Sequence, residues 1–183
     1  MGLNYLNLDQ ETRKFMTIEL NIDIEQGKVY LSPRLNSIGK ANYTNALKQS
    51  FLSGEDSSLS KQLRNGYLSE TEQRKTKVGY TTAKVPITAP DTLAEGEFNR
   101  YYIRALCRRA LDDSNFEIVV YRAKEVSDPR PSSKAKIGER FDPQQLIDDL
   151  RNNIGVDTSL GLPPGPNSGL SVQLKVKSQE VTA

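Results

Sequence analysis

The sequence contains no histidine, no tryptophan and a single cysteine. Without histidine, Ser-His-Asp and Cys-His nucleophile arrangements are excluded, because both need a base that titrates near neutral pH. Imidazole metal ligands are excluded as well, and one cysteine forms neither an intrachain disulfide nor a thiolate-rich zinc site. We therefore predict a non-enzymatic protein that needs no metal and no cofactor.

Long hydrophobic runs are also missing. Nowhere do apolar residues approach the roughly 18 in succession that a membrane span requires, and the first residues lack the basic and apolar segments of a secretory leader. These absences predict a cytoplasmic protein, or one assembled into a particle, with no membrane partner.

Core-forming residues are present in a modest amount. Leu, Ile, Val and Phe make up about a quarter of the chain, above the roughly 20% below which disorder is expected. We predict an α+β fold with a small helical block, a modest β-sheet and an extended Gly/Pro-rich C-terminal arm that ends in a strand. The predicted regions are an N-terminal helix/hairpin segment (1–35), a compact α+β domain (36–155) and the arm (156–183).

Capping residues and hydrophobic periodicity predict most of the elements. Thr92 and Glu95 match a capping box and open a helix expected to run to Leu111. The prolines within 128–133 predict an extended segment. The other predicted elements are helices within 36–54, 56–66 and 142–155, a central strand over 116–123, and an edge strand over 79–87.

Residues 9–27 allow two interpretations. From Met16 to Ile24 apolar and polar residues alternate strictly, as in a half-buried strand. Alternatively, Asp9 caps a single helix that ends at Gly27. We favour a short helix from Asp9 to about Met16 that leads into a hairpin, and the single helix is the alternative.

The C-terminal arm combines a Gly/Pro-rich stretch, 161–169, with an alternating apolar strand that begins at Leu170. Such a strand must pair with a sheet edge, in its own domain or in a neighbouring subunit. We predict an assembly arm, and deletion of 161–183 is expected to leave a folded monomer. Its candidate contact residues are Leu162, Pro164, Leu170, Val172 and Leu174.

Three arginines, Arg100, Arg104 and Arg108, recur every four residues on the helix that starts at Thr92. This spacing places them on one stripe opposite the apolar residues, so we predict that they face outward. We favour a solvated face whose arginines pair with acidic residues such as Glu97, Asp112 and Asp113, in this chain or in a neighbouring subunit. The alternative is a face that binds phosphate or carboxylate groups. Further candidate binding residues are Tyr101, Arg109, Lys124, Arg130, Lys134 and Lys136.

We conclude from the sequence that the protein is a structural or assembly protein that contacts other protein subunits in an oligomer, for example in a phage virion or phage-like particle. The alternative is a nucleic-acid-binding protein that uses the arginine stripe on the 92–111 helix. A second alternative is a small carboxylate-based enzyme, which would show a deep pocket lined by converging Asp, Glu, Tyr and Arg. Cys107, beside Leu106, is expected to be a buried hydrophobic residue.

Overall fold

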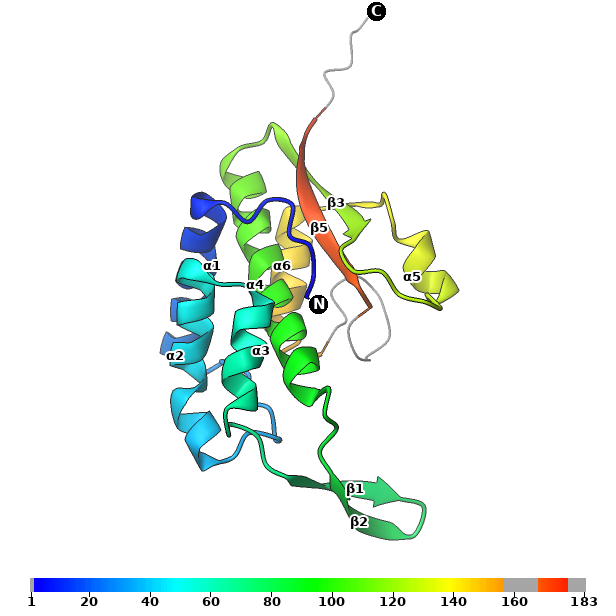
Figure 1. Cartoon of the computed structure of the whole chain (residues 1–183). Coiled ribbons are helices and arrows are strands. Elements are labelled where there is room, and N and C mark those ends of the chain that lie inside the picture. The colour runs from blue at the N-terminus through cyan, green and yellow to red at the C-terminus, as the bar shows by residue number, and fades with distance from the viewer. Residues whose placement is uncertain (1, 157–167, 178–183) are drawn as a thin grey trace, which may run out of the picture.

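The computed structural model describes residues 2–156 and 168–177, which form six helices and two small antiparallel sheets (Figure 1). The predicted α+β class is confirmed. Five helices build the main block: α1 (Gln10–Glu25), α2 (Ser37–Ser53), α3 (Asp56–Arg64), α4 (Ala89–Asp112) and α6 (Pro143–Asn152). Helix α4 is the central element, because α1, α3 and α6 all pack against it.

The preferred interpretation of residues 9–27 is wrong, because α1 is one continuous helix. The Asp9 side chain accepts a hydrogen bond from the Thr12 amide at 2.9 Å and caps the helix. Met16 and Leu20, one turn apart, are fully buried against the core. The alternating pattern of residues 16–24 is therefore also compatible with a helix whose apolar face includes Met16 and Leu20. Packing of this face against α4 favours the helix over the strand.

Helix α4 begins at Ala89, earlier than the predicted capping box. Pro90 occupies the first turn, where its missing N–H costs nothing. The Thr92 hydroxyl donates to the Thr88 carbonyl at 3.1 Å, so Thr92 lies inside the helix and does not cap it. Asp142 caps α6, as the capping residues predicted, and Asn36 caps α2.

The three-stranded sheet has the order β4-β3-β5 and packs on α4. Strand β3 (Phe116–Arg122) is central, as predicted, between β4 (Arg140–Phe141) and β5 (Leu170–Val176). Strand β5 runs antiparallel to β3 along its whole length, from Phe116 opposite Val176 to Arg122 opposite Leu170. The expectation of a wholly extended segment at 128–133 is wrong, because Pro131 opens the short helix α5 (Pro131–Ala135).

The two ends of the described chain meet at this sheet. The Asn4 amide donates to the Ala123 carbonyl at 2.8 Å, at the end of β3. The Leu174 amide of β5 donates to the Asn7 side-chain oxygen at 3.0 Å. A single core also takes side chains from all three regions named from the sequence, including Met16, Phe98 and Val172.

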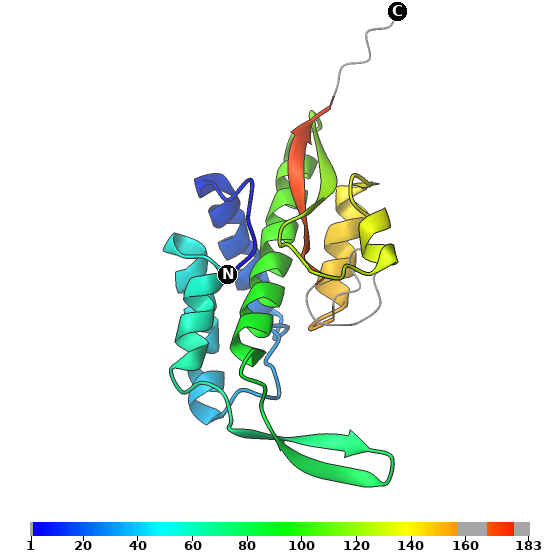
Figure 2. The same ribbon diagram turned by 45° about the vertical axis from the view of Figure 1, so that its right-hand side comes forward.

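A hairpin of two strands, β1 (Thr71–Thr76) and β2 (Gly79–Lys84), projects from the helical block between α3 and α4 (Figure 2). Strand β2 confirms the edge strand expected within 79–87. Strand β1 was not predicted, because its sequence is entirely polar and carries no hydrophobic period. Pairing with β2 is what defines it.

Candidate functional site

The arginine stripe on α4 does not face outward, which corrects the sequence prediction. Arg104 is 1% exposed and Arg100 is 8% exposed. The stripe is covered because α4 is packed by other helices on several sides, so the face opposite its apolar residues is buried too. The arginines pair with acids of this chain, which was the favoured interpretation, but they do so in the interior and not on a solvated face.

Arg104 lies at the centre of a buried ionic cluster between α1, α4 and α6. Its guanidinium donates to Glu19 at 2.8 Å and to Asp23 at 2.6 Å, and the Tyr101 hydroxyl also donates to Asp23 at 2.8 Å. Glu19, which is fully buried, also receives Arg108 at 2.5 Å and Arg151 at 2.7 Å. Burial raises the pKa of Glu19, but its hydrogen bonds from Arg151 and Arg104 outweigh burial and lower it overall.

Sequence reasoning missed Glu19 and Asp23, although a signal existed. The two acids are four residues apart, so in a helix they lie on one face together with Met16 and Leu20. The strand interpretation of this segment placed them among exposed polar residues. The charged groups of the cluster are therefore paired within the chain.

Arg100 has a different role from Arg104. Its guanidinium donates to the carbonyls of Leu150 at 3.1 Å, Asn153 at 2.8 Å and Val156 at 2.8 Å, and so satisfies the C-terminal end of α6. Its Nε lies 3.4 Å from Glu97, which was the pairing considered from the sequence.

The remaining basic candidates are scattered. Arg109 binds Asp9 at 2.8 Å and Glu11 at 3.0 Å, at the start of α1. Lys124 pairs with Glu95 of α4, and Lys136 pairs with Glu139 at 2.8 Å. Arg130 and Lys134 are exposed at α5. The structure therefore does not gather these residues and the α4 arginines into one basic surface.

The candidate assembly residues that the structure describes belong to the protein's own sheet. Leu170 and Val172 of β5 are buried in the core, and Leu174 packs against it. The strand thus finds its edge at β3, one of the two possibilities left open. Leu162 and Pro164 lie outside the described residues.

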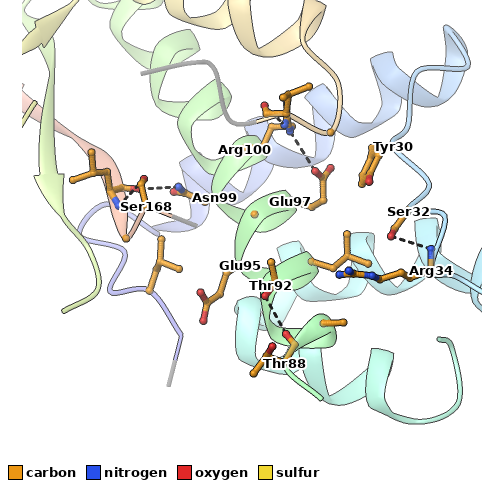
Figure 3. A pocket seen from close by; sticks show the side chains of 18 of the residues that line it. Tyr30, Ser32, Arg34, Thr88, Thr92, Glu95, Glu97, Asn99, Arg100 and Ser168 are labelled. Atoms are coloured by element: carbon orange, nitrogen blue, oxygen red, sulfur yellow. Dashed lines mark hydrogen bonds and ion pairs between the residues drawn. The ribbon is translucent and has the colours of Figure 1, made fainter. Parts of the chain in front are cut away.

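A pocket of about 520 Å³ lies at the N-terminal half of α4 (Figure 3). Its walls come from the segment between α1 and α2, from the base of the hairpin, and from the chain on either side of residues 157–167. The carboxylate-based enzyme considered from the sequence would have a pocket lined by Asp, Glu, Tyr and Arg. The described residues that line this pocket include Glu, Tyr and Arg but no Asp. The polar lining includes Tyr30, Ser32, Arg34, Thr92, Glu95, Glu97, Asn99, Arg100 and Ser168.

The charged groups of this pocket contact one another or nearby ions of the chain. Glu97 faces Arg100, Glu95 pairs with Lys124, and Arg34 holds Glu72 at 2.6 Å. Burial raises the pKa of Glu97 despite the opposing charge of Arg100. No substrate class follows from this arrangement.

Replacing Glu97 with Gln is expected to change how stability depends on pH. The folded state raises the Glu97 pKa above its ordinary value of 4.5. The contribution of the protonated Glu97 side chain to the free energy of unfolding is therefore fully present below pH 4.5. This contribution is lost as pH rises through the raised pKa. In urea unfolding over a pH series, the free energy of unfolding of the variant should rise relative to that of the wild type above pH 4.5. A difference that does not change with pH would contradict the burial of this carboxyl.

The most exposed part of the described surface is the hairpin. Val78, in its turn, is 99% exposed and Tyr80 is 74% exposed. Nearly every residue of both strands is exposed. The hairpin was not among the sites predicted from the sequence, because exposed polar strands resemble loops in composition.

The residues that the structure describes form neither a metal site nor a membrane-spanning helix. In 2–156 and 168–177 no group of three or more Cys, Asp or Glu side chains is placed to hold a metal ion. Within those ranges no helix combines the length and apolar character that crossing a bilayer requires. Cys107 is buried, as expected, and burial raises the pKa of its thiol.

Comparison with models of protein families, with curated proteins and with solved structures gives no match.

Proposed function

We propose that the protein is a non-enzymatic component of a larger complex, and that residues 71–84, the hairpin arm, are its contact element. The observation that carries this proposal is the exposure of the arm on both faces, out to its turn. An isolated two-stranded hairpin is only marginally stable in water. A projecting hairpin of this kind is therefore stabilised when a partner packs against it or pairs with its edge. A virion or phage-like particle is one complex of this kind.

The base of the arm is bonded to neighbouring segments of the protein, so the arm is held in a defined position for contact with a partner. Arg34 binds Glu72 at 2.6 Å, and the Val85 amide donates to the Glu70 carbonyl at 2.9 Å. Leu35 and Leu68 form an isolated bridge beside it. Beyond this base neither edge of the arm is paired with a third strand in the described part of the chain, so backbone groups remain available to a partner.

Shortening the arm is expected to reduce the mass of the native complex without unfolding the protein. Residues 74–81 are replaced by Asn-Gly, which closes a hairpin between Gln73 and Thr82, already opposite each other. No residue of the arm belongs to the hydrophobic core, so the thermal unfolding of the isolated chain should change little. The measurement is the native mass of the complex isolated from its source.

The matched control is Leu52→Ser, at an exposed apolar position of α2. This variant should leave the complex intact, because it removes apolar surface far from the arm in sequence. If the shortened variant and the control both retain the wild-type mass, the arm is not the contact element.

A further inference from the structure

The register of the hairpin arm separates its side chains into two faces of different chemistry. Because side chains alternate along a strand, Glu72 and Arg74 share one face. On that face Glu72 binds Arg34 at 2.6 Å and Arg74 at 2.8 Å. The opposite face contains no acidic residue and consists of Thr71, Gln73, Lys75, Tyr80, Thr82 and Lys84.

This second face, which we call the basic face, is exposed and largely uncommitted. Lys75 lies directly opposite Tyr80 in the register, and both are exposed. The Gln73 amide donates to the Thr82 hydroxyl at 2.8 Å and holds the two strands together. Lys77, in the turn, adds a third exposed cation beside Val78. Lys75, Lys84 and the Tyr80 ring therefore share one face of the arm, and Lys77 lies in the turn at its end.

The positive charge of the protein is concentrated in and beside the arm. Residues 61–84 contain six Lys or Arg and two Asp or Glu, a net charge of +4, whereas the whole chain carries +2. The remaining residues therefore carry a net charge of −2. Glu72, one of the two acids, is already held by two arginines. The arm is the part of the molecule suited to an anionic partner.

We infer that the basic face of the hairpin arm binds a nucleic-acid strand. Lys75, Lys77 and Lys84 contact backbone phosphates, and the Tyr80 ring stacks on a base. The inference rests on the proposed function and names the partner of its contact element. The nucleic-acid alternative considered from the sequence used the arginine stripe of α4, whereas this inference places binding on the hairpin arm.

The composition of the face favours nucleic acid over a protein surface. The buried centres of protein interfaces are depleted of Lys and enriched in several aromatic or apolar anchors. The basic face offers three lysines with the turn included, one aromatic ring and no apolar cluster. Lysine contacts with phosphate are strong without burial, because they release condensed counterions, and one exposed aromatic ring is enough to stack on a base.

The test is a titration of the full chain into a fluorescent single-stranded oligonucleotide of about 20 nucleotides, followed by anisotropy. Binding should weaken as salt is raised between about 50 and 200 mM. The variant K75Q/K77Q/K84Q should lose affinity, and its slope of log affinity against log salt should fall by about 2, since each phosphate contact contributes about 0.7.

Two matched comparisons make the result specific. The variant K14Q/K40Q/K48Q removes the same charge from exposed positions of α1 and α2 and should keep the wild-type slope. Tyr80→Leu should weaken binding about tenfold, whereas Tyr80→Phe, which keeps the ring, should retain it. The thermal unfolding of all four variants should match the wild type, because none of these residues lies in the core.

Three outcomes would overturn the inference. The first is no oligonucleotide binding at about 50 mM salt, and the second is an equal loss in both lysine variants. The third is binding of poly-glutamate as tight as that of the oligonucleotide, with no effect of Tyr80→Leu, which would indicate an acidic protein partner. If oligonucleotide binding fails but shortening the arm still reduces the native mass, the proposed function stands and only the nucleic-acid partner is wrong.

Discussion

Replacing Arg104 with Met is expected to lower the free energy of unfolding by about 3 to 5 kcal/mol, the usual cost of removing one partner from a buried ion pair. The guanidinium holds Glu19 and Asp23, and both acids are buried. Glu19 keeps Arg108 and Arg151, whereas Asp23 is left with the Tyr101 hydroxyl. Most of the loss therefore comes from Asp23. Urea denaturation followed by circular dichroism gives the value.

Two comparisons check this explanation. Arg74→Met breaks an ion pair on the exposed arm and should cost less than about 1 kcal/mol. Adding Asp23→Asn to Arg104→Met removes the uncompensated charge and should restore part of the lost stability. Equal losses for Arg74→Met and Arg104→Met, or no recovery in the double variant, would contradict the role assigned to the cluster.

Deleting residues 161–183 is expected to leave the chain unfolded, in contrast to the folded monomer expected from the sequence. The deletion removes β5, which pairs along the whole of β3 and buries Leu170 and Val172 in the core. Each lost core side chain costs about 2 to 5 kcal/mol, and the whole protein has only about 5 to 15 kcal/mol of stability. Near-ultraviolet circular dichroism and the loss of a cooperative urea transition report the outcome.

Point variants in β5 test whether the deletion acts through the lost strand or only through the shortening of the chain. Val172→Ala, at a fully buried position, should cost about 2 kcal/mol. Val176→Ala, which is 70% exposed at the end of β5, should change stability by less than about 0.5 kcal/mol. A truncated protein that unfolds cooperatively as a monomer would show that β5 is dispensable for the fold.

The parts of the fold that depend on neighbouring residues could be predicted from the sequence. Asp142 caps α6 through a side-chain oxygen that accepts the backbone amide three residues later. The run of β-branched and aromatic residues at 116–122 gave β3, the central strand. At Thr92 the same reasoning failed, because Pro90 also marks a helix start and lies earlier in the chain.

The parts that depend on distant residues could not be predicted. Glu19 and Arg104 are 85 positions apart, and nothing within either helix shows that the other covers it. The stripe of Arg100, Arg104 and Arg108 was therefore assigned to solvent. Strand β1 has no hydrophobic period, so only its register with β2 makes it a strand. The sequence therefore predicted β2 but not its pairing with β1, which forms the hairpin arm.

The hydrogen bond between Leu174 and Asn7 spans 167 positions of the chain. During synthesis the first residues leave the ribosome long before β5 is made, so β3 waits with one edge unpaired and apolar side chains uncovered. Contacts of such large sequence separation slow folding and prolong exposure of aggregation-prone edges. One edge of β3 therefore stays exposed to such pairing until nearly the whole chain has been made.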